Sequence, residues 1–148
     1  MNKNGFLISL SVSDKTEFGR KDFANQSRPQ KIFSAIWEVE AEVNNGGFKQ
    51  YFLNNSAESA HFVAEALEAI GAPKTAEICR RAIAIAFPSG LPKATELIQS
   101  AAADFSDETM DKLDELDQEF FAYPHNLTDL LFAFVSTHPE EFGTVSND

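Results

Sequence analysis

Apolar residues recur along most of the chain at the three- and four-residue spacing that is typical of one face of an α-helix. The first clear stripe begins just after Pro29 and consists of Ile32, Ile36, Val39 and Val43. Proline is frequent in the first turn of helices, so we expect this helix to start near residue 29. The sequence Asn-Asn-Gly-Gly at 44–47 predicts its end, because Asn and Gly tolerate the left-handed backbone of a helix cap.

The same spacing predicts several more helices. They are expected over 47–53, over 57–70, from Pro73 to Pro88, from Pro92 onward, from Ser106 to about Phe121, and from about Pro124 to His138. Prolines stand at several starts and glycines at several ends, as the conformational limits of these residues require. The aromatic residues of the 47–53 helix, together with Leu97 and Phe121, fall on faces that we expect to be buried.

Residues 1–27 are the poorly predicted part of the chain. Phe6, Ile8, Leu10 and Val12 alternate with polar residues there, and a short helix near Ser13 is one interpretation. No strand pair, linker or repeat is visible elsewhere. The prediction is an all-α fold: a single-domain irregular bundle of about six or seven helices over residues 1–148, with its helical core at 28–138.

Composition supports one folded core in a reducing compartment. The 148 residues are 43% hydrophobic and include 14 Phe, enough apolar surface to offset the loss of chain entropy on folding. A single cysteine, Cys79, excludes a disulfide within the chain and a multi-thiolate metal site. No run approaches the roughly 20 apolar residues that a membrane span needs. We therefore expect a cytoplasmic protein.

The net charge of -11 is concentrated in the last third of the chain. Residues 1–100 contain 11 acidic and 11 basic side chains, whereas residues 101–148 contain 12 acidic side chains and only Lys112 as a base. An asymmetry of this kind disfavours direct binding to nucleic acid or to an anionic membrane. It favours a basic protein as the partner, and a DNA-binding protein fits best; the oligomeric state is not predicted.

The segment 37–54, Trp-Glu-Val-Glu-Ala-Glu-Val-Asn-Asn-Gly-Gly-Phe-Lys-Gln-Tyr-Phe-Leu-Asn, resembles the signature of a family of small bacterial helical proteins. That family was formerly of unknown function and includes a DNA-mimic protein. The resemblance extends over roughly residues 30–135, through Ile70-Gly71-Ala72 and Leu116-Asp117-Gln118-Glu119-Phe120. It implies an all-helical fold and a role in occupying the DNA-binding surface of a regulatory protein.

The motif is more readily explained as structure than as a site. Its residues are Trp37, Glu40, Asn44, Asn45, Gly46, Gly47, Phe48, Gln50, Tyr51 and Phe52. Helix-cap chemistry accounts for the glycines, and an aromatic cluster accounts for the rings. The amides beside a Gly-permitted backbone approach leave a functional site as the alternative.

The helix expected over 107–121 carries a strongly acidic face. At 100° per residue, its apolar residues share one sector and its acids fall on the opposite side. With Asp104, the candidate partner-binding residues are Asp107, Glu108, Asp111, Asp114, Glu115 and Glu119. A solvated face that only keeps the protein soluble is the competing interpretation. Like charges four residues apart each cost a few tenths of a kcal/mol, so helix stability alone does not require them.

Two acids lie on apolar faces instead. Asp117 falls inside the apolar sector of its helix, and Glu40 interrupts the stripe of the first one. An unpaired buried carboxylate is costly, so we expect each to be an internal hydrogen-bonded tie. For Asp117 the expected partner is a Tyr, the Trp37 indole or an Arg.

No catalytic constellation, metal site or cofactor motif is found in the sequence. His61, His125 and His138 are isolated from one another, and no phosphate loop or nucleophile motif occurs. The leading hypothesis is an acidic, non-enzymatic regulatory protein that acts as a DNA mimic toward a basic partner such as a transcription factor. Two alternatives remain open: an immunity or antitoxin protein against a basic nuclease, and an enzyme with its site at the Asn44–Gln50 corner.

Overall fold

The chain is helical throughout the residues that the computed structural model describes, which are 3–12 and 22–142. The predicted all-α fold is confirmed, with eight α-helices, slightly more than expected, and no strand in these two ranges. The α-helices are α1 (Lys3–Val12), α3 (Arg28–Leu53), α4 (Val63–Ala69), α5 (Pro73–Ala86), α6 (Thr95–Ala103), α7 (Asp107–Phe121), α8 (Leu127–Ser136) and α9 (Pro139–Phe142). Two 3-10 helices, η1 (Phe23–Asn25) and η2 (Asn55–Ser59), precede and follow α3.

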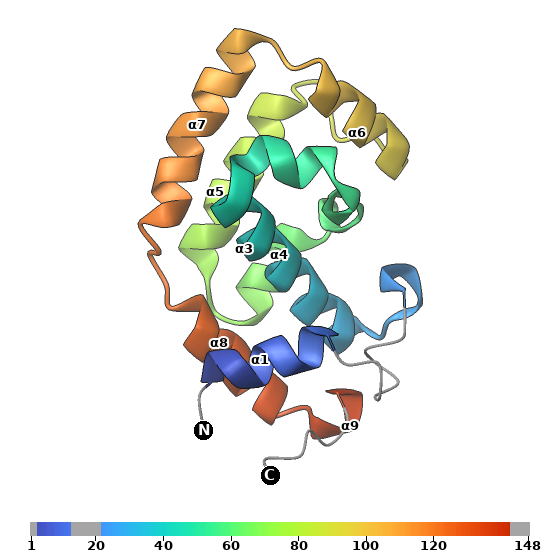
Figure 1. The fold of residues 1–148 in the computed structure, drawn as a ribbon, viewed down its shortest axis with the longest axis vertical. Coiled ribbons are helices and arrows are strands. Elements are labelled where there is room, and N and C mark those ends of the chain that lie inside the picture. The colour runs from blue at the N-terminus through green and yellow to red at the C-terminus, as the bar shows by residue number, and fades with distance from the viewer. Residues whose placement is uncertain (1–2, 13–21, 143–148) are drawn as a thin grey trace.

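Helix α3 runs through the middle of the molecule, where it contacts η2, α4, α6, α7 and α9 (Figure 1). A capping box fixes its start: the Ser27 hydroxyl accepts a hydrogen bond from the Gln30 N–H, and the Gln30 side chain accepts one from the Ser27 N–H. The predicted apolar stripe is buried along its whole length. The most regular part of the sequence pattern therefore forms the central helix.

The motif at 44–47 bends α3 sharply and does not end it. The backbone leaves the helical region at Gly46 (φ -155°, ψ 17°) and Gly47 (φ 79°, ψ -179°), and the helix then continues to Leu53. The predicted stop and the predicted short helix are thus two parts of one bent element. The bend directs Phe48, Tyr51 and Phe52 into the core, where all three are buried.

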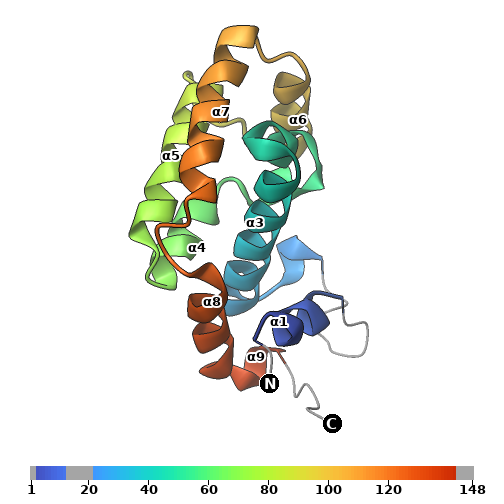
Figure 2. The ribbon, with the colours of Figure 1, turned by 60° about the vertical axis from the view of Figure 1, so that its left-hand side comes forward.

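The other helices gather at the two ends of α3. Helices α5 and α7 run side by side in both views, α7 contacts α3, and α4 packs against α3 and α5 (Figures 1 and 2). At the other end, α1 packs on α8, and α9 contacts both α3 and α8. None of the helices in the described ranges combines the length and the apolar character needed to cross a membrane.

Phenylalanine rings join the bent end of α3 to its neighbours. The Phe52 ring meets the Phe87 and Phe105 rings edge-on, with centroids 5.2 and 6.3 Å apart. Phe48 meets Phe120 of α7 at 90° and 5.9 Å. Edge-to-face pairs add about 0.5–1.5 kcal/mol each beyond the burial of their surface. The aromatic half of the motif therefore helps to hold α7 in place.

Residues 3–12 form helix α1, which the alternating N-terminal pattern did not predict. It packs on α8 through Leu7, which is buried, and through Phe6, whose ring lies edge-on to Phe132 at 5.4 Å. Ile8 remains 45% exposed, so α1 buries a narrow face and lacks a wide apolar stripe. The helix suggested near Ser13 lies outside the described residues, as do the side chains of Leu10 and Val12.

Three other predictions differ from the structure. The helix expected over 57–70 is divided into η2 and a short α4, and the helix expected from Pro92 begins only at Thr95. Leu97 and Phe121 are 59% and 41% exposed, although both were placed on buried faces. Each lies at the edge of its apolar sector, and helical spacing alone does not reveal how much of a sector a neighbouring element covers.

Candidate functional site

Helix α7 begins as its sequence predicts. The Ser106 hydroxyl accepts a hydrogen bond from the Thr109 N–H at 3.1 Å, which caps the helix, and Asp107 and Glu108 occupy its first turn. Negative side chains there interact favourably with the positive end of the helix dipole. The apolar side packs inward through Leu113, Leu116 and Phe120, all buried. This packing turns the opposite side of α7 toward solvent.

Seven acidic side chains on and just before α7 are all exposed, and we call them the acidic ridge. They are Asp104, Asp107, Glu108, Asp111, Asp114, Glu115 and Glu119. Among the described residues, two of them form ion pairs: Glu119 with Arg81 of α5 at 2.7 Å, and Glu108 with Lys112 at 3.2 Å. Exposed ion pairs of this kind add little to the stability of a protein. The other five ridge carboxylates have no ion pair in the described part of the chain. The ridge therefore keeps most of its negative charge.

A hollow of about 320 Å³ separates the ridge from the bend of α3. Its lining consists of Gly46, Lys49, Asp107, Met110, Asp111, Leu113, Asp114 and Asp117. The only base among these residues is Lys49, whose Nζ lies 3.4 Å from the Met110 sulfur. Three ridge carboxylates thus border a concave surface beside the family motif, a shape into which a lysine or arginine side chain can enter.

Asp117 is an internal tie, but not to the partners expected. It is 9% exposed, and its Oδ1 accepts a hydrogen bond from the Phe48 backbone N–H at 2.8 Å. Burial raises the pKa of Asp117, and the Phe48 N–H partly opposes that rise. Neither a Tyr, the Trp37 indole nor an Arg supplies the bond, because the bend of α3 presents a backbone donor at this point.

Gly47 makes that hydrogen bond sterically possible. Its backbone (φ 79°, ψ -179°) is one that essentially only glycine adopts. A Cβ atom at this position would also collide with Asp117 Oδ2. The second glycine of the motif is thus required by both its conformation and the carboxylate beside it.

Glu40 and Asn44 are connected through Tyr123, just after α7. Asn44 Nδ2 donates to Tyr123 Oη at 2.6 Å, and Tyr123 Oη donates to Glu40 Oε1 at 3.0 Å. Tyr123 has a left-handed backbone (φ 49°), which turns its ring back toward α3. Burial raises the pKa of Glu40. Sequence reasoning placed Glu40 as an internal tie but missed Tyr123, whose role has no signal in the local pattern.

The remaining motif residues mostly pack or brace the bend. Trp37 is half-buried and stacks on Phe33 with ring centroids 5.6 Å apart. Gln50 Nε2 donates to Glu42 at 2.6 Å, and the Tyr51 hydroxyl shares a 2.6 Å hydrogen bond with Ser59. Asn45 is exposed. These contacts support the structural interpretation of the motif.

Sequence reasoning also missed a pair of neighbouring acidic side chains, Glu38 and Glu58. Glu38 of α3 lies close to Glu58 and Ser59 of η2. Burial and the negative charge of Glu58 raise the pKa of Glu38 to about 8. One of its oxygens, Oε2, is buried without a hydrogen-bond partner. Contact between α3 and η2 creates this pair, so the spacing within α3 could not predict it.

The histidines are apart from one another, as in the sequence. His61 bonds the Pro92 carbonyl, the His125 ring accepts from the Lys74 N–H, and His138 bonds the Phe134 carbonyl. Within ranges 3–12 and 22–142, no three His, Cys, Asp or Glu side chains are grouped to hold a metal ion.

Comparison with known proteins identifies a family. The chain matches the sequence profile described as DMP19-like protein over residues 24–138, which covers α3 to α8 and both sides of the bend. No curated protein and no solved structure matches it. Because the match extends over most of the chain, this protein belongs to the DMP19-like protein family.

Proposed function

We propose that this protein is an acidic, non-enzymatic regulatory protein whose acidic ridge occupies the DNA-binding surface of a basic partner, such as a transcription factor. The resemblance to a family that includes a DNA-mimic protein suggested this role. Membership of the DMP19-like family is consistent with it. The residues that would perform it lie outside the family motif, so the proposal depends on the surface of α7.

The observation that carries the proposal is the arrangement of charge on that surface. All seven ridge carboxylates are exposed, and only Arg81 and Lys112 pair with any of them in the described part of the chain. From Asp107 to Glu119 the ridge extends for about 18 Å along α7, at a rise of roughly 1.5 Å per residue. The six ridge carboxylates of α7, less the charge of Lys112, give one net charge per about 3.6 Å, close to the spacing of phosphates along one DNA strand.

Binding would then follow the chemistry of phosphate contacts. Lysine and arginine side chains that neutralise DNA phosphates would meet ridge carboxylates instead. The hollow beside Gly46 gives such a side chain a concave place in which Asp107, Asp111 and Asp114 surround it. Attraction of this kind is screened by salt and decreases as ionic strength rises.

A capture experiment tests the proposal. The protein is immobilised and exposed to native bacterial lysate at low salt, and bound proteins are eluted with double-stranded DNA. We expect DNA to release proteins that bind DNA themselves, and binding to fall steeply with salt. The ridge variant Asp107→Asn/Asp111→Asn/Asp114→Asn/Glu115→Gln should capture them at least about tenfold less well, since each exchange removes a charge-assisted contact.

A matched control separates the ridge from net charge. The variant Glu65→Gln/Glu68→Gln/Glu77→Gln/Glu96→Gln removes the same number of exposed carboxylates from α4, α5 and α6. It should capture the same proteins as the unchanged chain. Equal loss in both variants, or capture that DNA does not reverse, would show that the ridge does not imitate DNA. Capture of a nuclease that the protein inhibits would identify the immunity role in place of regulation.

A further inference from the structure

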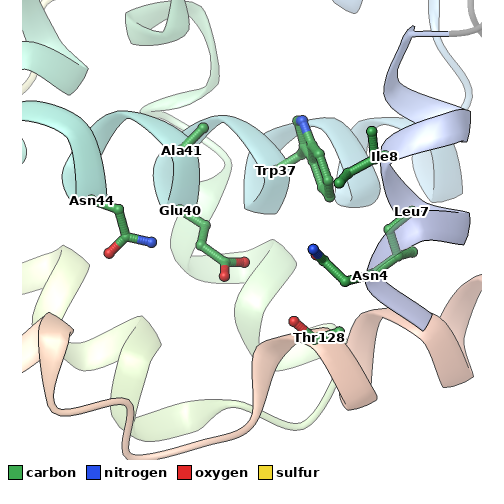
Figure 3. A pocket seen from close by; sticks show the side chains of 8 residues that line it. All are labelled: Asn4, Leu7, Ile8, Trp37, Glu40, Ala41, Asn44 and Thr128. Carbon is green, nitrogen blue, oxygen red and sulfur yellow. The ribbon is translucent and has the colours of Figure 1, made fainter. Parts of the chain in front are cut away.

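A second hollow lies between α1, α3 and α8, away from the acidic ridge (Figure 3). Its volume is about 240 Å³, and an adjoining hollow of about 540 Å³ shares three of its residues. The shared residues are Asn4, Glu40 and Thr128. Three segments far apart in the chain therefore meet around one concave site, whose lining includes the motif residues Trp37, Glu40 and Asn44 and none of the ridge residues.

Among the residues that the structure describes, Glu40 is the only charged one that lines either hollow. Its carboxylate projects from α3 toward Asn4 and Thr128 (Figure 3). The hydrogen bond from Tyr123 holds one carboxylate oxygen, Oε1, in place, and Asn44 in turn holds the Tyr123 hydroxyl. The nearby Lys3 is engaged with Asp129 at 3.0 Å. The site thus presents a positioned acid, and no described residue of its lining is a cation.

The wall beside Glu40 is apolar. The Trp37 ring and the Ile8 side chain extend into the hollow in Figure 3, Leu7 and Ala41 add further apolar surface, and Asn44 lies at its edge beyond Glu40. Phe33 stacks on the indole at 5.6 Å with only 10° between the ring planes, which fixes its orientation. Tryptophan is the side chain that attracts cations most strongly through its ring.

We propose that this hollow binds a small alkylammonium ion. The ammonium group donates to the Glu40 carboxylate, and Asn4 and Thr128 supply further oxygen acceptors. The alkyl chain lies along Trp37 and Ile8. The volume of about 240 Å³ beside Trp37 lies below that of typical ligand sites of roughly 300–1,000 Å³, so an alkyl chain of a few carbon atoms fills it, and the adjoining hollow leaves room beyond Glu40. The inference is independent of the role of the ridge.

The same features select against other ligands. A carboxylate or phosphate would meet the negative charge of Glu40 without any basic side chain in the lining to neutralise it. A neutral alcohol would bury the same alkyl chain but would lack both the ion pair and the cation–π contact. The three ligand charges therefore give distinguishable results with one carbon skeleton.

The fluorescence of Trp37 provides a direct test, because it is the only tryptophan in the chain. The full-length protein is titrated at constant ionic strength with n-pentylammonium, and separately with pentan-1-ol and pentanoate. We expect a saturable change with n-pentylammonium and none with the other two over the same range. Its affinity should rise from pH 5 to pH 8, because burial raises the pKa of Glu40 while the amine stays protonated.

Variants connect the response to the site. Glu40→Gln keeps an acceptor for Tyr123 but removes the charge, and should weaken n-pentylammonium binding by at least about tenfold. Asn4→Ala on the exposed side of α1 should weaken it by a smaller factor. Glu96→Gln removes one carboxylate from α6, at the other end of the molecule, and should bind as the unchanged chain does (Figure 1). Circular dichroism shows whether each variant is folded.

Any of three results would overturn the proposal: no saturable response to n-pentylammonium, an equal response to pentan-1-ol, or unchanged affinity in folded Glu40→Gln. A parallel titration with Nα-acetyl-lysine methylamide distinguishes the sources of the ammonium group. Tighter binding of this compound indicates a lysine side chain of a partner protein. Tighter binding of n-pentylammonium indicates a free amine.

Discussion

Asp114 and Asp117 are three residues apart on α7 and differ in almost every physical respect. Asp117 is 9% exposed and receives a hydrogen bond from the Phe48 N–H across the bend of α3. Asp114 is exposed on the ridge and has no ion pair in the described part of the chain. The same residue type is an internal tie in one position and a surface charge in the other. Three steps of about 100° leave the two side chains roughly 60° apart, on either side of the boundary between the buried and the exposed face of α7.

The difference separates the contribution of the motif to the fold from the charge that α7 presents to solvent. The tie joins α7 to Gly47 and Phe48, two residues of the motif, and thus belongs to the fold. The ridge touches the motif only at the hollow beside Gly46. The bend of α3 therefore accounts for the way α7 is held, while the proposed function depends on side chains that the fold leaves exposed.

Gly47→Ala should have the largest effect on stability. The alanine would have to adopt a backbone conformation that side chains with a Cβ disfavour, and its Cβ would collide with Asp117. We therefore expect a loss of at least about 3 kcal/mol in the free energy of unfolding. Urea denaturation measures it. Gly71→Ala is the control, because Gly71 has a φ of +87° but open space around its Cβ position, and should lose about 1 kcal/mol. Equal losses would show that Asp117 does not restrict position 47.

Asp117→Ala should cost about 1–3 kcal/mol, since it leaves the buried Phe48 N–H without an acceptor. Asp117→Asn keeps an acceptor oxygen and should stay closer to the unchanged protein. The double variant Gly47→Ala/Asp117→Ala should lose less free energy of unfolding than the sum of the two single variants, because the carboxylate that the new Cβ would meet is absent. Strictly additive losses in chemical denaturation would contradict the coupling of these two positions.

Glu38→Gln should change how stability depends on pH. The folded pKa of Glu38 is about 8, above the ordinary value of 4.5. Between these values the unfolded chain releases a proton that the folded chain retains, so the free energy of unfolding falls as pH rises. In Glu38→Gln the free energy of unfolding should fall less as pH rises. At pH 8 it should exceed that of the unchanged protein by at least about 1 kcal/mol. Glu96→Gln, on exposed α6, should keep the original slope; a slope unchanged in Glu38→Gln would refute the burial argument.

The smallest effect on stability is expected at the ridge. Removing four carboxylates in Asp107→Asn/Asp111→Asn/Asp114→Asn/Glu115→Gln relieves like-charge repulsion along α7 and weakens the favourable contact with the helix start. These terms oppose each other, so the free energy of unfolding should change by less than about 1 kcal/mol. Thermal melts at low salt measure the change. A loss as large as that of Asp117→Ala would mean that the ridge serves the fold.

The sequence alone determined most of the helices and the two sides of α7, although it missed α1 and predicted an end to α3 at 44–47. Helix geometry is local, and a step of 100° per residue assigns each side chain to a face without knowledge of any neighbour. That reasoning separated the six ridge acids of α7 from Asp117 and placed the aromatic residues of the motif in the core. It failed at Leu97 and Phe121, where exposure depends on how far a neighbouring helix extends.

Only the tertiary structure decided which groups meet. Asp117 and Phe48 are 69 residues apart, and Tyr123 lies 83 residues from Glu40. The hollow at Trp37 needs α1, α3 and α8 together, and the raised pKa of Glu38 needs η2 against α3. Hydrogen bonds and hollows of this kind depend on the relative placement of distant segments, which the packing of many side chains sets jointly and no local spacing records.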